Sequence, residues 1–108
     1  MKKAFEVLKG QPRVKIRLTR DSVAAGDDFD PPHARDVETY SFLDPVALIT
    51  SIHPGYLPGV AGVGHSWDCI LNDRLIATVT VREVLPKVHE VEYSSENHLH
   101  FLYRSASY

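Results

Sequence analysis

The stretch from residue 65 to residue 83 constrains the fold most, and it reads HSWDCILNDRLIATVTVRE. It contains two apolar, β-branched runs separated by Asn72 and Asp73. Asn and Asp tolerate the left-handed backbone that a two-residue turn needs, so the pattern predicts a β-hairpin. The expected cross-strand pairs are Leu71 with Arg74, Ile70 with Leu75, and Cys69 with Ile76.

Both faces of this expected hairpin carry apolar side chains, whereas a surface hairpin alternates more cleanly. We therefore expect cover on both faces, from the bend of a small barrel, from a helix or from a second subunit. One face would hold Ile70, Leu75, Ala77 and Val79, and the other Trp67, Cys69, Leu71 and Ile76. We expect Trp67 to lie in the core or at a subunit interface, and Cys69 to act as a small core hydrophobe.

Residues 13–20, RVKIRLTR, alternate strictly between basic and apolar side chains, which predicts a strand with one wet face. The basic stripe has two interpretations. It is either a solvated strand face that discourages edge pairing, or a phosphate-contacting surface. The acidic segment that follows, residues 21–40, is predicted as a long connection that folds back over the stripe.

The other elements complete a small, mostly β fold. Residues 1–9 predict a short N-terminal helix that ends near Gly10. Residues 41–53 are ambiguous, and the Asp44-Pro45 start favours a short helix over a strand. Residues 89–93 and 98–104 both alternate, which predicts a second hairpin. The expected fold is a five-stranded antiparallel bent sheet or small barrel, with strands near residues 13, 65, 74, 89 and 98. A long loop separates the first strand from the central hairpin; within it, residues 54–64 form a Gly- and Pro-rich connector that stops the preceding element at Pro54-Gly55.

Length and composition limit the class of protein. The chain has 108 residues, which suits one domain, and a formal net charge of -2, which argues against a generally basic nucleic-acid binder. The single Cys cannot form an internal disulfide. No signal-peptide pattern and no membrane-spanning apolar run occurs, so we expect a cytoplasmic protein without a membrane partner.

The pattern Asp68-x-x-Leu71-Asn72-x-x-Leu75 resembles the first signature of Sm-like proteins, and a Gly-rich stretch ending at Gly64 precedes it. The segment 102–105, Leu-Tyr-Arg-Ser, is similar to the family's second signature, although Ser stands where Gly is usual. The resemblance implies an Sm-like or SH3-like small barrel and a ring-forming oligomer that binds single-stranded RNA. It further implies that Asn72 contacts a base, that Asp68 supports Asn72, and that Arg104 stacks on or contacts a base.

The residue types also allow two other functions, a metal site and a nucleophilic triad. His98 and His100 share a strand face at a spacing that metal sites use, although such a pair is also an ordinary polar face. His65, Ser66 and Asp68 have the residue types of a nucleophilic triad, but local clustering does not support one. We therefore expect a non-enzymatic interaction module without a cofactor, binding single-stranded RNA as an Sm-like oligomer. The alternatives are a protein-interaction or assembly domain, and a His-dependent metal-binding protein.

Overall fold

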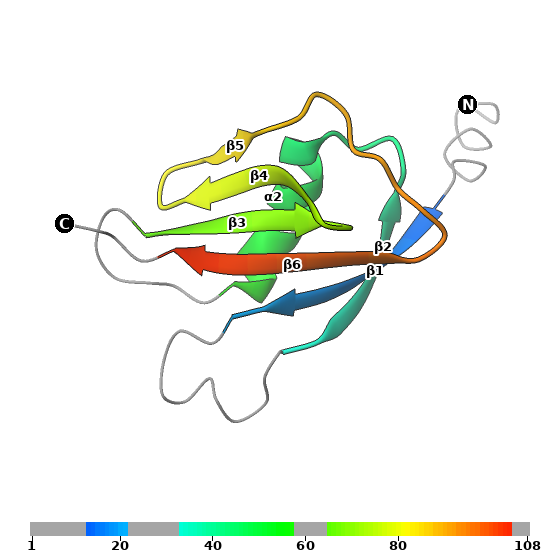
Figure 1. The fold of residues 1–108 in the computed structure, drawn as a ribbon, viewed down its shortest axis with the longest axis horizontal. Coiled ribbons are helices and arrows are strands. Elements are labelled where there is room, and N and C mark those ends of the chain that lie inside the picture. The colour runs from blue at the N-terminus through cyan, green and yellow to red at the C-terminus, as the bar shows by residue number, and fades with distance from the viewer. Residues whose placement is uncertain (1–12, 22–32, 58–64, 105–108) are drawn as a thin grey trace, which may run out of the picture.

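A computed structural model describes residues 13–21, 33–57 and 65–104 of the chain. In these residues six strands form a single sheet, and one helix packs on one face of it (Figure 1). The elements are β1 (Arg13–Arg20), β2 (Arg35–Tyr40), α2 (Pro45–Tyr56), β3 (Ser66–Leu71), β4 (Arg74–Thr80), β5 (Val84–Pro86) and β6 (Asn97–Arg104). The expected helix at residues 1–9 lies outside the described residues.

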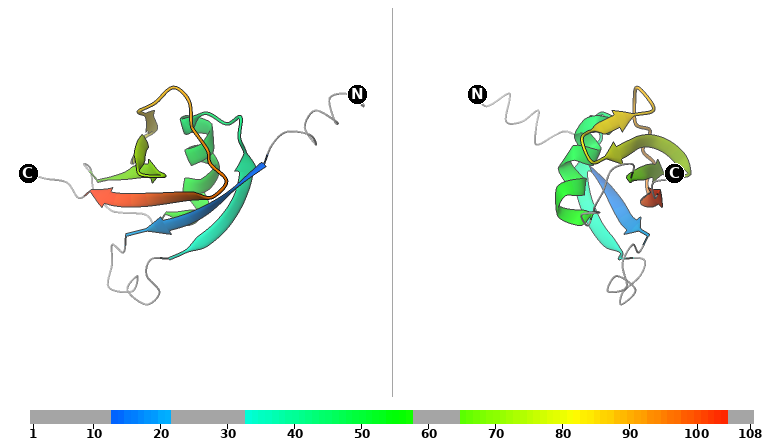
Figure 2. Two further views of the ribbon diagram at one scale, coloured as in Figure 1. Left: turned by 45° about the vertical axis from the view of Figure 1, so that its right-hand side comes forward. Right: turned by 90° about the vertical axis from the view of Figure 1, so that its left-hand side faces the viewer.

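The strand order is β2-β1-β6-β3-β4-β5, and the sheet is open rather than closed into a barrel. It curls so that α2 lies on its inner face, as Figure 2 shows. All neighbouring strands are antiparallel except β1 and β6, which run parallel. The mostly β class and the bent sheet are confirmed, but the expected count of five strands and the all-antiparallel pairing are wrong.

The central hairpin forms around the predicted turn. Asn72 and Asp73 have φ values of 50° and 69°, which is the left-handed region that a two-residue hairpin loop requires. The pairs Leu71 with Arg74 and Ile70 with Leu75 are as expected. A β-bulge then shifts the register, and Cys69 pairs with Ala77 instead of Ile76.

This bulge explains why both faces of the hairpin looked apolar. A one-residue slip moves side chains to the opposite face of a strand. It places Ala77 opposite Cys69 and Val79 opposite Trp67, and all four are buried, while Leu75 on the turn side is exposed. The bulge thus gathers the buried apolar residues of the hairpin on the inner face, where α2 supplies the cover by a helix that the sequence predicts (Figure 2).

The core lies between the inner face of the sheet and α2. Trp67 and Cys69 belong to it, so their interpretation as core residues is confirmed. Its buried members are Ile16, Leu18, Leu48, Ile49, Ile52, Tyr56, Trp67, Cys69, Leu71, Ile76, Ala77, Val79, Leu99 and Phe101.

Burial raises the pKa of the Cys69 thiol from 9.0 to about 12, and the neighbouring Asp68 carboxylate adds to this rise. The unfolded thiol ionises first, so its contribution to stability is complete below pH 9 and is lost as the pH rises towards 12. Between pH 8 and pH 10.5 we expect this group to lower the free energy of unfolding by about 2 kcal/mol. Urea unfolding at the two pH values measures the loss. Cys69→Ala should show a loss smaller by about that amount, and equal losses in the two proteins would contradict the assignment.

Helix α2 begins as the sequence predicts. Asp44 is the N-cap, its side chain accepts a hydrogen bond of 2.7 Å from the Ala47 amide, and Pro45 occupies the first turn. The helix continues through Pro54 to Tyr56, so the expectation that Pro54-Gly55 would end it is wrong. A proline in the last turn removes one hydrogen bond of the helix, and Leu57 N still reaches His53 O at 3.0 Å to close that turn.

Three further expectations about strands are wrong. Residues 35–40, expected within a loop, form β2 and pair with β1. Residues 79–84 are apolar enough to predict that the second hairpin strand continues until Pro86, but the chain turns after Thr80 and β5 pairs back on β4. Residues 89–93 form no strand, because β1 and β3 already occupy both edges of β6. Their apolar side chains, Val91 and Tyr93, pack against the core from a loop instead.

Candidate functional site

Of the three residues that the Sm-like resemblance groups together, the structure brings Asp68 and Arg104 into contact and leaves Asn72 apart. Arg104 Nε donates to Asp68 Oδ2 at 2.7 Å, and the Thr78 hydroxyl donates to Asp68 Oδ1 at 3.0 Å. Asn72 lies four residues further along the chain, about 13 Å away by strand geometry. Asp68 therefore holds Arg104, and its side chain supports no contact with Asn72.

Asn72 extends the contact between the hairpin turn and β6. Its backbone N–H donates to His98 O at 2.9 Å, and its Oδ1 accepts from His98 N at 2.9 Å. Its Nδ2 donates to Asn97 Oδ1, also at 2.9 Å. The side-chain amide thus mimics a further step of the β3–β6 ladder, which is a structural role for this residue.

Substitutions of Asn72 separate its backbone role from its side-chain role. Asn72→Ala removes the side-chain hydrogen bonds. It also places alanine, which has no polar group to form a local hydrogen bond, at a strained positive φ. We therefore expect a loss of about 2 kcal/mol in the free energy of unfolding. Asn72→Gly removes only the hydrogen bonds, and we expect about 1 kcal/mol. Denaturant unfolding of both variants checks the order, and an equal or larger loss for glycine would contradict it.

A cavity of about 910 Å³ opens beside Asn72, at the end of the sheet where β6 begins. Lys15, Arg17 and His98 contribute nitrogen donors to its lining, while Asp36, Glu38 and Glu96 contribute carboxylates. Its charge is therefore mixed. The Sm-like resemblance implies that Asn72 contacts a base, and the cavity places this residue on a concave surface.

The basic stripe of β1 is matched by acidic residues of β2. Arg17 Nη1 lies 3.1 Å from Asp36 Oδ1, and Arg13 Nη1 lies 3.9 Å from Glu38 Oε1. The segment 35–40 turns back beside β1 as a paired strand of the same sheet, so the expectation that it folds over the stripe as a loop is wrong. Since Arg13 and Arg17 each have a carboxylate partner, the stripe has less net positive charge than the sequence of β1 suggests.

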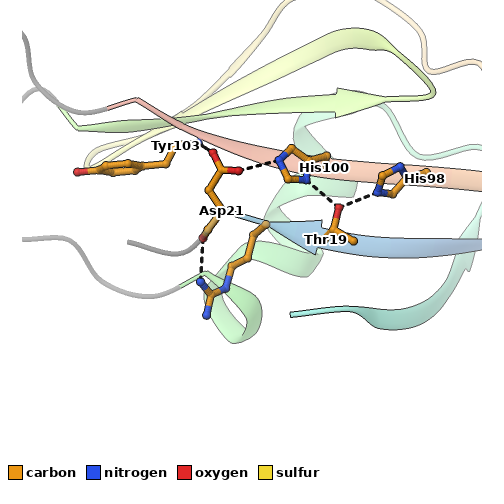
Figure 3. Close-up of polar contacts among 6 residues, drawn as sticks. Thr19, Asp21, His98, His100 and Tyr103 are labelled. Carbon is orange, nitrogen blue, oxygen red and sulfur yellow. Dashed lines mark hydrogen bonds and ion pairs between the residues drawn. The ribbon is translucent and has the colours of Figure 1, made fainter. Parts of the chain in front are cut away.

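A chain of polar contacts crosses from β1 to β6 on the outer face (Figure 3). The Thr19 hydroxyl lies 2.6 Å from His98 Nε2 and 2.7 Å from His100 Nδ1. His100 Nε2 lies 3.0 Å from Asp21 Oδ1, and the other oxygen of Asp21 accepts from the Tyr103 amide at 2.8 Å. In a neutral His100, donation to Asp21 leaves Nδ1 as the acceptor of the Thr19 hydroxyl proton, and His98 then donates to the Thr19 oxygen.

This chain links the one parallel strand pair of the described sheet. Its order of hydroxyl, imidazole and carboxylate is that of an activated nucleophile, but Thr19 is only 7% exposed and lines neither the cavity beside Asn72 nor the groove described next. Within residues 13–21, 33–57 and 65–104, no group of three or more His, Cys, Asp or Glu side chains is placed to hold a metal ion. His98 Nε2 and His100 Nδ1 are instead hydrogen-bonded to the Thr19 hydroxyl.

A second concave surface, which we call the β2–α2 groove, lies between the edge strand β2 and the second half of α2. Its volume is about 420 Å³. Leu18, Val37 and Ile52 form an apolar floor, and Thr39 and Ser51 place hydroxyls along the walls. Helix α2 packs on β4 and β5, which lie at the opposite edge of the sheet from β2, and this leaves a space between α2 and β2.

The β2–α2 groove ends at Arg35, where β2 begins and α2 ends. Arg35 Nη1 donates to Gly55 O at 3.3 Å, and its guanidinium carbon lies 5.2 Å from the centre of the Tyr56 ring. Tyr56 is fixed by its hydroxyl, which donates to His33 O at 2.7 Å, and by its ring contact with Phe101. Desolvation raises the pKa of Tyr56, so its hydroxyl stays protonated as this donor.

No family model, no curated protein and no solved structure matches this chain. The resemblance to Sm-like proteins therefore stays a prediction. No helix among the described residues is long and apolar enough to cross a membrane.

Sequence reasoning missed the β2–α2 groove and the contacts of Asn97. The groove could not be predicted, because the sequence of residues 21–40 is acidic and predicts a loop where β2 forms. Residues 94–97, Ser-Ser-Glu-Asn, have the composition of a plain turn, whereas the Asn97 side chain is buried and hydrogen-bonds to three parts of the chain. A polar residue that opens an alternating apolar strand is the one signal that pointed to it.

Proposed function

We propose that the protein is a non-enzymatic interaction module that binds an extended segment of a partner protein along β2. The observation that carries the proposal is the combination of an edge strand with an adjoining apolar groove. β2 is the terminal strand of the sheet, and no described strand pairs with its outer edge. Alternate residues of such a strand leave their N–H and C=O groups available to another chain.

The β2–α2 groove supplies what strand addition needs for specificity. In this binding mode, main-chain hydrogen bonds give affinity, and pockets for alternate side chains select the sequence. The floor of Leu18, Val37 and Ile52 would receive apolar side chains of the bound segment. Asp36 and Glu38 form ion pairs with Arg17 and Arg13 of β1, and Glu38 also borders the groove. Their charges discourage unspecific edge pairing.

The test uses a pool of synthetic hexapeptides with free C-termini. Valine, leucine and isoleucine vary at the last, third-last and fifth-last positions, with serine and threonine between them. Titration into ¹⁵N-labelled protein should shift the amide signals of Val37, Thr39 and Ile52. No shift on β2 or α2 at millimolar peptide would contradict the proposal.

A matched pair of helix variants sharpens this test. Ser51 is exposed on the groove wall, and Thr50 is exposed on the same helix but does not line the groove. Ser51→Arg should fill the groove and weaken binding on the order of tenfold, while Thr50→Arg should leave it unchanged. Arginine is a good helix former, so both variants should keep the fold.

A second candidate function is binding of single-stranded RNA by an oligomer, as the Sm-like resemblance implies. The cavity lined by Lys15, Arg17, Asn72 and His98 supports it. Against it stand the carboxylates of that cavity and the ion pairs of the basic stripe. Filter binding to oligo(U) at two salt concentrations tests it, because phosphate contacts require affinity to fall with salt. The absence of a salt slope, or a monomer in light scattering, would contradict this candidate.

A further inference from the structure

We infer that the β2–α2 groove binds the C-terminal end of a partner chain, with the free carboxylate held by Arg35. This inference rests on the proposed function and specifies the chemistry of its ligand. The inference rests on three features that lie together: the Arg35 guanidinium, the largely apolar groove that it borders, and the outer edge of β2, with which no described strand pairs.

Arg35 is held in place by neutral groups. Its contacts are the carbonyl oxygen of Gly55 at 3.3 Å and the face of the Tyr56 ring at 5.2 Å. The ring in turn is fixed by Phe101 and His33, so the exposed guanidinium is oriented by its contacts while its other donors face solvent. A guanidinium presents five N–H donors, and one carbonyl occupies a single donor.

The other arginines on the sheet show what is different about Arg35. Arg17 pairs with Asp36, Arg104 pairs with Asp68, and Arg13 and Arg74 pair with glutamates. Within residues 13–21, 33–57 and 65–104, no carboxylate pairs with Arg35. Charge complementarity therefore calls for an anion here, and a carboxylate matches the paired donors of a guanidinium in a bidentate geometry.

The position of Arg35 also sets the direction of the bound chain. Arg35 is the first residue of β2, so a peptide that ends beside it runs towards the start of β2 and is antiparallel to it. Alternate side chains of that peptide then point to Leu18, Val37 and Ile52. The groove extends from Arg35 to Thr39, about 13 Å of strand, which matches four or five peptide residues.

The plain alternative is that Arg35 only stabilises the end of α2. Its bond to Gly55 O would satisfy a carbonyl in the last turn, as basic side chains commonly do. That role predicts a stability effect and no preference between ligands. A preference for a free carboxylate therefore separates the two roles.

The experiment compares three forms of the hexapeptide pool described above. The first pool has a free C-terminal carboxylate. The second pool has a C-terminal amide. The third pool also has a C-terminal amide, but its last residue is glutamate, so that it carries a side-chain carboxylate near its end. Fluorescence polarisation should show the free carboxylate binding on the order of tenfold more tightly than the plain amide. Equal binding of these two pools would overturn the inference and leave the proposed function standing. Equal binding of the glutamate amide and the free carboxylate would overturn the C-terminal assignment.

Variants then assign the preference to one residue. Arg35→Gln should remove the tenfold preference while the amide pool binds as before. Arg74→Gln, an exposed arginine at the hairpin turn, is the matched control and should keep the preference. A preference that survives in Arg35→Gln would overturn the inference, whereas failure of every pool to bind the wild-type protein would overturn the proposed function itself. The wild-type comparison stands even if Arg35→Gln lowers the melting temperature.

Discussion

Replacing Phe101 with alanine is expected to lower the free energy of unfolding by about 4 kcal/mol. Phe101 is fully buried at the centre of β6, between Arg20 of β1 and Cys69 of β3. Its ring also contacts the Tyr56 ring, with centroids 5.7 Å apart, so it joins the sheet to α2. Removing the ring leaves a cavity that the surrounding strands cannot close, because each is paired on both edges.

Urea unfolding followed by circular dichroism measures this loss. The matched control is Leu102→Ala, since Leu102 is the next residue on the same strand and is only half-buried on the outer face. We expect about 1 kcal/mol for that control. A loss below about 2 kcal/mol for Phe101→Ala would contradict the placement of this ring at the centre of the core.

Asn97→Ala is expected to cost about 3 kcal/mol in the free energy of unfolding. The Asn97 side chain is buried and joins three segments that are distant in the chain. Its Nδ2 donates to Lys15 O at 3.1 Å and to Ser94 O at 2.9 Å. Its Oδ1 accepts from Ser94 N and from Asn72 Nδ2, both at 2.9 Å. Truncation leaves these backbone and side-chain groups without hydrogen-bond partners, and a buried polar group without a partner lowers the free energy of unfolding.

The control for Asn97 is Ser94→Ala, which removes a more exposed hydroxyl from the same loop. We expect a loss of at most about 1 kcal/mol there. Asn97→Asp should also be strongly destabilising, since it keeps the acceptor oxygen but loses both donated bonds. Losses of similar size in Asn97→Ala and Ser94→Ala would contradict the role of Asn97 as the joint between β1, β6 and the hairpin turn.

Local features of the fold could be predicted from the sequence because their causes are local. The turn at Asn72-Asp73 follows from the tolerance of both residues for positive φ, and the start of α2 follows from the Asp44-Pro45 cap. The alternation of β1 follows from its basic and apolar residues. The burial of Trp67 and Cys69 follows from their place in an apolar strand.

The remaining features depend on contacts between distant segments. The bulge at Cys69 and Ile70 is visible only once β4 is paired, and the strand β2 forms because β1 supplies both hydrogen bonds and arginine partners for its acidic side chains. The parallel pairing of β1 and β6 has no local signature. It also decides that residues 89–93 remain a loop, because it uses the edge of β6 that a second hairpin would need.

The candidate site was predictable only in part for the same reason. Asn72 and the pair His98 and His100 could be singled out from their residue types. Their hydrogen bonds to β6 and to Thr19 could not, since these join residues that are 26 and about 80 positions apart. The β2–α2 groove depends on β2, and it could not be predicted while that segment was read as a loop.

Amide hydrogen exchange along β2, with and without the free-carboxylate hexapeptide pool, tests the central claim most directly. Strand addition predicts that alternate amides of Arg35–Tyr40 exchange more slowly on the bound protein, because they become hydrogen-bonded to the peptide. The amides of β5, the strand at the opposite edge, should be unaffected. Unchanged exchange throughout β2 at saturating peptide would contradict the account.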